Sequence, residues 1–358
     1  MNILWLSWRD IKNPQSGGAE KVALEVSKRL VADKNKVTIF TSRFSDSKTF
    51  ENIEGINIIR SGNALTCRLF AFFYYIKNKN NYDLLIDEIN TIPFFTPLYT
   101  KNKSVTLIHQ LAKEYWFKQT YFPLNIIGYS SEAFWLKLYK KQRTLALSNS
   151  TKTDLKKLGF KNVTSYQIGL DFKPKLFSKK ENLILFIGRL TYAKGPHDAI
   201  RAFKIIHATY PQTKLSIIGK GNPKFINSLR KLIQNLDLEK SVKMEGFVAQ
   251  PKKLELLIKA KIALVPSVRE GWNLVTTEAN ATGTIPIGYN VPGLCDSIQN
   301  GKTGLLTKPN PESLASATIK LLSNPKLQKT LSLNGFKWSK EFTFEKTYQS
   351  FKKIIVDN

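Results

Sequence analysis

The sequence contains little cysteine and few acidic residues. Cys67 and Cys295 are its only cysteines, which excludes a disulfide framework, and they lack the clustered spacing of a zinc site. The longest apolar run, Leu69–Ile76, is far shorter than the roughly 20 residues that span a bilayer. Walker loops, serine-centred elbows and Asp-x-Asp pairs are also missing. We therefore expect no resident metal or cofactor and a reducing, cytoplasmic setting.

The start of the chain carries no basic leader. Met1–Ser7 is too short an apolar run for a signal peptide, so we interpret it as a first strand.

The shortage of acids leaves a large positive charge. Lys and Arg number 55 against 27 Asp and Glu, a net charge of +28. This favours anionic partners such as phosphates, nucleic acids or an acidic membrane surface. The charge is spread along the chain: residues 1–170 hold 25 basic and 13 acidic residues, and the remainder holds 30 and 14. A Lys/Asn/Ile-rich composition therefore explains the charge as well as an anionic partner does.

Apolar runs alternate with amphipathic stretches in both halves of the chain. The expected strands are 3–6, 37–40, 56–59, 84–86, 105–108, 183–187, 215–218, 242–244 and 262–265, and the expected helices are 19–31, 196–207, 225–236, 311–322, 326–333 and 344–356. This alternation predicts an α/β protein with a parallel sheet in each half. The length favours two domains, which we place at 1–168 and 169–339. Ligands of such sheets bind beyond the carboxyl ends of the strands.

Two carboxylates eight positions apart are the most informative pattern. Glu270 follows the strand at 262–265, and Glu278 falls about one turn inside the next helix. Between them, Gly271, Trp272, Asn273 and Leu274 place backbone amides at a helix N-terminus, which suits a phosphate or an oxygen-rich ligand. A nucleotide sugar carries hydroxyls on both sides of a phosphate and fits this order. The alternative is a surface Glu followed by an ordinary helix Glu.

Two further loops follow strands. After 183–187, Gly188 lets the backbone turn, and Arg189 and Lys194 supply two cations that would neutralise a diphosphate. A solvated basic turn is the alternative interpretation. After the first strand, a long loop ends at Gly17 and Gly18, which permit close approach of a phosphate or sugar; a simple helix start is the alternative.

Polar residues also follow two strands of the first half. His109 comes directly after 105–108, where it could reach a cleft or make a local hydrogen bond. Asp87, Glu88 and Asn90 end the strand that begins at residue 84, and they could bind acceptor hydroxyls or form a solvated turn.

Two stretches, 68–77 and 133–141, combine aromatic residues with lysines. This composition is typical of an interfacial helix, and equally of a core helix with a basic outer face.

Several of these motifs together resemble glycosyltransferase family 4, the retaining GT-B enzymes. The resemblance rests on Gly17–Glu20, Gly188–Leu190 with Lys194-Gly195, the Glu270/Glu278 pair and Pro292–Leu294, in matching order over essentially the whole chain. It implies two Rossmann-like domains that face each other across a cleft. It also implies a last helix, at about 340–358, that crosses back onto the N-terminal domain.

The resemblance also implies roles for individual residues. Arg189 and Lys194 would hold the donor diphosphate, Glu270 the donor sugar, and Glu278 the ribose. His109 would contact the sugar near its reacting carbon. The remaining donor-side residues would be Gly17, Gly18, Gly188, Gly246, Phe247, Gly271, Trp272, Asn273 and Leu274, and the acceptor-side residues Glu20, Asp87, Glu88 and Asn90.

Trp272 and Asn273 depart from the family's usual Phe and Gly, which puts the identity of the sugar in doubt. The activity implied is metal-independent retaining transfer from a nucleotide diphosphate sugar to a glycan or lipid-linked acceptor, with no specific nucleic acid as partner. The charge and the aromatic stretches favour an envelope glycan met at the cytoplasmic membrane face, with the protein peripheral on an anionic surface. A catalytically silent GT-B module that binds membrane or RNA, and a sugar-nucleotide epimerase, are the alternatives.

Overall fold

The computed structural model describes residues 1–100, 103–119, 121–177 and 179–356. The chain forms two compact units. Unit 1 contains residues 1–113, 126–169 and 343–358, and unit 2 contains 114–125 and 170–342. The short segment 114–125, which the division at residue 168 placed with the N-terminal domain, thus belongs to unit 2.

Unit 1 is built on a mixed sheet whose strands run β3-β4-β2-β1-β5-β6-β7-β8. All neighbours are parallel except β3 and β4, which pair antiparallel. The strands are β1 (Asn2–Leu6), β2 (Lys36–Thr41), β3 (Phe50–Ile53), β4 (Ile56–Arg60), β5 (Leu84–Ile89), β6 (Ser104–Ile108), β7 (Arg143–Ala146) and β8 (Val163–Ser165).

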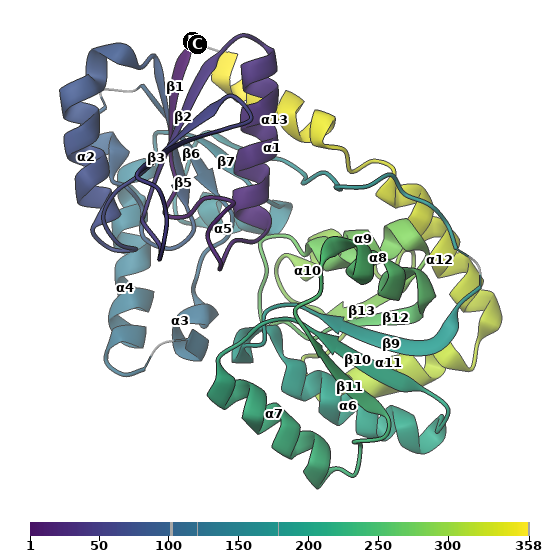
Figure 1. Ribbon diagram of the computed structural model, residues 1–358. Helices are drawn as coiled ribbons and strands as arrows, with labels where there is room; N and C mark the ends of the chain where they lie inside the picture. Colours follow the sequence, from purple (N-terminus) through teal and green to yellow (C-terminus); the bar gives the residue numbers. More distant parts are fainter. Residues whose placement is uncertain (101–102, 120, 178, 357–358) are drawn as a thin grey trace. The chain divides into compact units, whose positions relative to one another are not determined.

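The helices of unit 1 cover both faces of this sheet (Figure 1). They are α1 (Gly18–Ala32), α2 (Cys67–Asn78), α4 (Leu124–Leu136), α5 (Asn149–Lys157) and α13 (Phe344–Val356), with short 3-10 turns η1 (Lys79–Asn81), η2 (Thr96–Leu98) and η3 (Lys137–Tyr139). Helix α2 buries Cys67, Ala71 and Tyr75 against the sheet. The stretch at 68–77 therefore lies in a helix as predicted, whereas 133–141 crosses from α4 into η3 and a turn.

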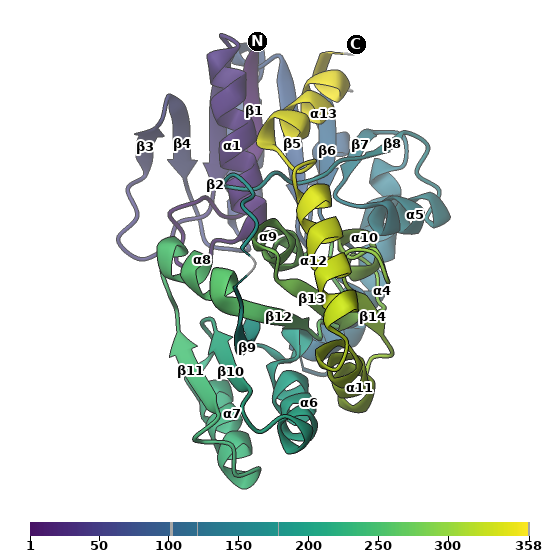
Figure 2. The same ribbon diagram turned by 90° about the vertical axis from the view of Figure 1, so that its right-hand side faces the viewer.

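The last helix returns to unit 1, as the resemblance implied. In α13, Phe351 stacks on Trp5 of β1 with ring centroids 5.7 Å apart, and the Tyr348 hydroxyl donates to Asp33 Oδ2 at 2.7 Å. Both ribbon views show α13 beside α1 (Figures 1 and 2).

Unit 2 is built on a fully parallel sheet with the order β11-β10-β9-β12-β13-β14. Its strands are β9 (Glu181–Ile187), β10 (Lys214–Ile218), β11 (Val242–Gly246), β12 (Ala260–Val265), β13 (Ile285–Tyr289) and β14 (Leu305–Thr307). Its helices are α3 (Glu114–Gln119), η4 (Tyr192–Lys194), α6 (Pro196–Thr209), α7 (Pro223–Asn235), α8 (Gln250–Lys259), α9 (Leu274–Thr282), α10 (Leu294–Ser297), α11 (Pro311–Leu322) and α12 (Pro325–Ser339).

Two apolar clusters enclose the unit 2 sheet. Side chains of α6, α7 and α11 fill one face, including Phe203, Leu229 and Leu321, and Leu257 of α8 and Ala279 of α9 fill the other. Both faces of this sheet are therefore covered, as is usual for a parallel sheet.

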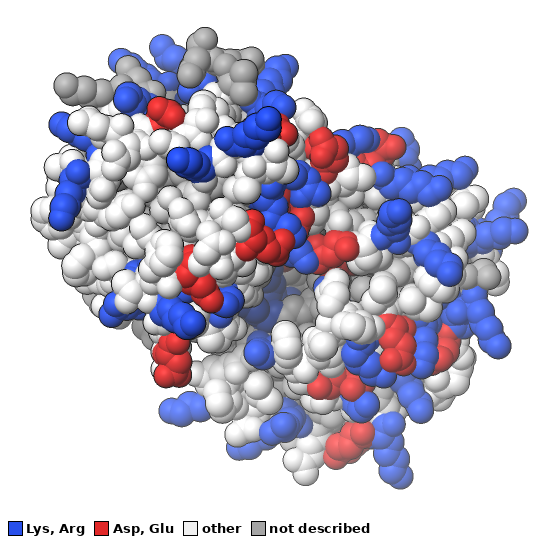
Figure 3. Space-filling view, turned by 45° about the horizontal axis from the view of Figure 1, so that its top comes forward, with Lys and Arg blue, Asp and Glu red and all other residues white. Residues whose placement is uncertain are grey.

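On one face of the molecule, positive charge is scattered rather than gathered in a stripe (Figure 3). On the face seen in Figure 3, Lys and Arg side chains are distributed widely, with Asp and Glu among them. In the part of the chain that the structure describes, no helix has both the length and the apolar character needed to cross a bilayer.

Candidate active site

The loops after β9 and β12 meet at the carboxyl edge of the unit 2 sheet. The two strands are neighbours in the sheet, so the loops that follow them begin side by side. The amide of Val268 donates to the carbonyl of Ala193 at 3.0 Å and ties one loop to the other. This bond brings the loop that carries Arg189 and Lys194 close to the loop that carries Glu270.

Lys194 and Glu270 form an ion pair within that cluster. The Lys194 Nζ lies 2.6 Å from Glu270 Oε1 and 2.7 Å from Oε2, and the side chains are only 17% and 6% exposed. Burial lowers the pKa of Lys194, but the charge of Glu270 outweighs this and the net shift is upward. The lysine therefore stays protonated, and a cation and an anion are held ready at the strand ends.

Asn273 joins this pair to helix α9. As the N-cap residue, its Oδ1 accepts from the amide of Thr276 at 3.1 Å, while its Nδ2 donates to Glu270 Oε1 at 3.0 Å. One side chain thus starts the helix and orients the carboxylate. An asparagine directly before an apolar helical run is a recognised N-cap signal, so this role could have been predicted from the sequence.

Two glycines allow the backbone contacts that place the pair. Gly195 has φ +70°, and a Cβ there would lie 2.3 Å from the carbonyl oxygen of Pro266. Gly293 has φ +81°, and a Cβ would lie 2.1 Å from the carbonyl oxygen of Glu270. The Glu270 amide also donates to Pro292 at 3.0 Å. The Pro-Gly-Leu motif therefore supports the backbone of Glu270.

Arg189 is exposed beside this cluster and forms no side-chain hydrogen bond or ion pair with another described residue. Its guanidinium is therefore available to an anionic ligand. Gly188, before it, donates its amide to the carbonyl of Ile218 at 3.0 Å, which places the start of this loop beside β10.

Glu278 lies within α9 and is 6% exposed. Its Oε1 accepts from the Lys253 Nζ of α8 at 2.7 Å. Nothing in the sequence indicated Lys253, because the pairing depends on how α8 and α9 pack.

A lysine and an aromatic ring meet at the ends of β10 and β11. The Lys220 Nζ lies 4.1 Å from the centroid of the Phe247 ring, which is 68% exposed. Gly246 before it has φ +70°, with nothing within 4 Å of where a Cβ would be, so the loop is open at this point. Lys220 was missed in the sequence because only the fold brings it beside Phe247.

Trp272 packs away from the Lys194–Glu270 pair. Its ring lies 5.3 Å from Phe342 and 6.3 Å from Trp338, and its Nε1 donates to Thr277 at 3.0 Å. The side chain thus belongs to an aromatic cluster beside α12. Gly271 precedes it in the loop, and Leu274 is the first residue of α9.

Helix α3 adds two residues that sequence reasoning missed. Glu114 pairs with Arg269, and Tyr115 is buried where the charges of Lys194 and Glu270 act on it. Burial raises the pKa of Tyr115, so its hydroxyl keeps its proton. No motif marks these residues, since they lie about 155 positions from Glu270 in sequence and only the fold joins them.

Unit 1 holds His109 in a defined orientation. Its Nε2 lies 2.8 Å from Glu88 Oε1, and the other oxygen of Glu88 accepts from Trp5 Nε1 at 2.7 Å. His109 is 5% exposed and Glu88 is 1% exposed. Glu88 of β5 lies beside His109 because β5 and β6 are neighbouring strands. Since Trp5 holds its other oxygen, the carboxylate fixes the orientation of the imidazole.

Asp87 is fully buried and bonded within unit 1. It accepts from the hydroxyls of Tyr139 at 2.6 Å and Thr96 at 2.8 Å. Burial raises its pKa, and these hydrogen bonds oppose the shift. Asn90, just beyond β5, is partly buried, and its acceptor-side role stays a prediction.

Glu20 caps the start of α1. The Gly17 amide donates to Glu20 Oε2 at 2.7 Å, and the other oxygen of Glu20 accepts from Arg9 Nε at 2.9 Å. Glu20 therefore closes the first turn, and Gly18 opens the helix.

Comparison with known proteins finds a family model and relatives for this chain. Residues 168–338 match the model of the family "Glycosyl transferases group 1". A glycogen synthase of Mycobacterium tuberculosis is 32% identical over 188 residues, which cover 50% of this chain and 44% of that enzyme. The matched segment is thus less than half of that relative.

Two solved structures share the whole fold. Sucrose-phosphate synthase from Thermosynechococcus elongatus has a TM-score of 0.81 at 20% identity, with 99% of this chain and 98% of that chain covered. Anabaena Alr3699/HepE in complex with UDP-glucose has a TM-score of 0.78 at 18% identity, with full coverage of both chains. The architecture is therefore GT-B, with two parallel-sheet α/β domains, as expected from the sequence.

Proposed function

We propose that this protein is a retaining, metal-independent glycosyltransferase that moves a sugar from a nucleotide diphosphate sugar to an acceptor hydroxyl. The observation that carries the proposal is the Lys194–Glu270 pair at the strand ends of a glycosyl transferases group 1 domain. Without a donor, the two groups neutralise each other. A donor diphosphate would take over the ammonium and leave both carboxylate oxygens to accept hydroxyl hydrogen bonds.

The proposed roles follow from charge. Arg189 and Lys194 stabilise the diphosphate as it leaves, the step at which negative charge develops. Glu270 binds donor-sugar hydroxyls and Glu278 those of the ribose. His109, oriented by Glu88, contacts the sugar near its reacting carbon. In the retaining reaction, a donor phosphate oxygen helps to remove the acceptor proton.

The first donor to test is a UDP-sugar, because Alr3699/HepE, which shares the fold, is solved with UDP-glucose. We propose an envelope or lipid-linked glycan as the acceptor, met at the cytoplasmic membrane face. The excess of basic residues and the exposed aromatic side chains of α2 support this choice.

Thermal-shift measurements with UDP-, GDP- and ADP-sugars test donor binding, since a bound ligand stabilises the folded state by mass action. Product analysis then separates the functions: transfer with retained anomeric configuration supports the proposal. Isomerised donor would identify an epimerase. Absence of both turnover and donor binding would identify a binding module. Arg189→Ala should lower kcat by about 10²–10³-fold at unchanged melting temperature. Arg230→Ala, on the exposed face of α7, is the matched control and should leave kcat unchanged.

A further inference from the structure

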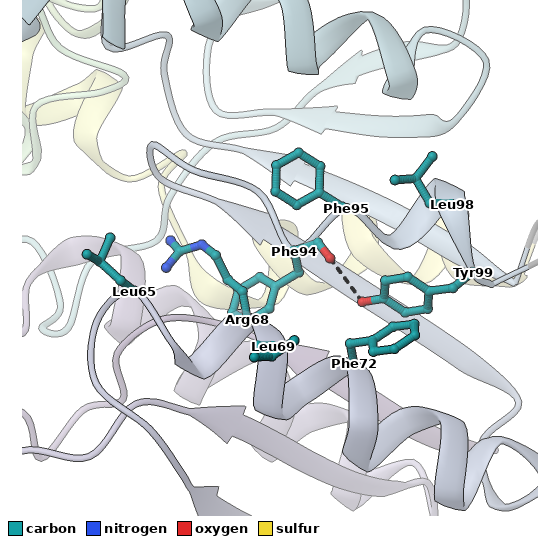
Figure 4. Close-up of a pocket in the computed structure, with 8 residues that line it drawn as sticks. All are labelled: Leu65, Arg68, Leu69, Phe72, Phe94, Phe95, Leu98 and Tyr99. Atoms are coloured by element: carbon teal, nitrogen blue, oxygen red, sulfur yellow. Dashed lines mark hydrogen bonds between the residues drawn. The ribbon is translucent and has the colours of Figure 1, made fainter. Parts of the chain in front are cut away.

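Unit 1 contains an apolar pocket of about 440 Å³ between the start of α2 and η2 (Figure 4). Leu65, Leu69 and Phe72 line it from the α2 side, and Phe95 and Leu98 line it from the η2 side. The wall is therefore built from large apolar side chains, which suit a hydrocarbon group.

The rim of the pocket is unusually exposed. Leu65 is 69% exposed and Leu98 is 67% exposed. The outer side of α2 continues this surface with the exposed side chains of Leu69, Phe73 and Ile76. The outer face of this helix is thus apolar, in contrast to the basic outer face that the sequence had left open. A contiguous apolar surface of this kind marks an interaction site.

Hydrogen bonds to Asp87 hold one wall of the pocket in place. Asp87 accepts from Thr96 Oγ1 at 2.8 Å and from the Phe94 amide at 3.3 Å, which fixes the segment that forms one wall. Phe95 adopts φ +58°, a left-handed conformation that is strained for a bulky residue. Strain of this kind persists where surrounding contacts over-determine it, and it is concentrated at ligand sites.

The charges around the pocket suit an anion. Asp87 lies behind the wall, bonded to Thr96, Tyr139 and the Phe94 amide, and residues 55–82 and 89–113 contain no Asp or Glu. Arg68 lies in the pocket wall, beside Leu65 and Phe94 (Figure 4). Its Nε and Nη2 donate to the carbonyl of Ile92 at 3.1 and 2.8 Å, which fixes the guanidinium there. A hydrocarbon chain with an anionic head therefore matches both the wall and its cation.

We propose that this pocket binds the hydrocarbon chain of an anionic lipid, which is the lipid part of the acceptor. This inference rests on the proposed function, because it assigns a place to the acceptor. It gives Asp87 its acceptor-side role through the segment that it holds, without direct contact with a sugar.

Binding of dodecyl phosphate to the full chain, measured by isothermal titration below its critical micelle concentration, tests the assignment. Leu65→Asp and Leu98→Asp should each weaken binding about tenfold or more, because each replaces an apolar contact of the pocket wall with a charged group. Both side chains are largely exposed, so the fold should persist. Phe50→Asp on the edge strand β3, at 59% exposure, is the matched control and should bind as the unchanged protein does.

Equal affinity in the pocket variants and the control would overturn the proposal. If inorganic phosphate binds as tightly as dodecyl phosphate, the pocket does not recognise a hydrocarbon chain and the proposal fails. If dodecanol binds as tightly as dodecyl phosphate, the pocket does not recognise an anionic head group and the proposal fails. Stabilisation by UDP should be the same in all three variants. Its absence from the unchanged protein would count against the proposed function and leave the lipid result standing.

Discussion

Breaking the Lys194–Glu270 pair should reveal how strongly the ligand-free site is held together. The Lys194 Nζ lies 2.6 Å from the nearer Glu270 oxygen, and at an effective dielectric constant of about 20 the attraction is about 6 kcal/mol. Dehydration of both groups offsets much of this. Removal of one partner leaves the other charge buried, which typically costs about 3–5 kcal/mol.

A double-mutant cycle on the free energy of unfolding measures this coupling. We expect Glu270→Gln and Lys194→Met each to lower stability by about 3–5 kcal/mol, or melting temperature by about 10 °C. The double variant should lose much less than the sum, because no charge is left unpaired. The pairing raises the pKa of Lys194, so its stabilising effect should be fully present below 10.5, the ordinary lysine value, and decline at higher pH.

Additive single effects, with coupling below about 0.5 kcal/mol, would refute this reasoning. The control is Lys252→Met with Glu255→Gln on α8, an ion pair whose side chains are 48% and 44% exposed. Solvent screens such a pair, so its cycle should show no measurable coupling.

Three other predictions concern the same cluster. Asn273→Ala should lower the free energy of unfolding by about 1–2 kcal/mol in chemical denaturation and should reduce kcat. Asn273→Asp should keep the helix cap but still lose activity, because a second carboxylate then faces Glu270. Full activity in the aspartate variant would contradict this. Gly293→Ala should cost about 1–3 kcal/mol and raise the KM for the donor, since the new methyl group displaces the backbone of Glu270; an unchanged KM would count against that contact. Activity in EDTA should equal that in Mg²⁺ if Arg189 and Lys194 neutralise the donor diphosphate, as we propose. Loss of activity in EDTA and recovery with Mg²⁺ would disprove metal independence.

The alternation of elements was predictable from the sequence because buried parallel strands are continuous apolar runs. Ile184–Ile187 and Ile262–Val265 are examples, and both lie in the centre of the unit 2 sheet. Shorter or less regular strands were not predicted. Strand β8 has only three residues, and β13 contains Pro286 and Gly288, which break the apolar pattern.

The sequence by itself determined the two α/β halves and the motif residues at the ends of their strands, because hydrophobic periodicity and glycine-rich turns are local properties. Only the tertiary structure decided which of these residues touch. It paired Lys194 with Glu270 and Lys253 with Glu278, and it brought Tyr115 into unit 2. Pairing of side chains depends on strand order and helix packing, which join residues far apart in the chain and leave no local pattern.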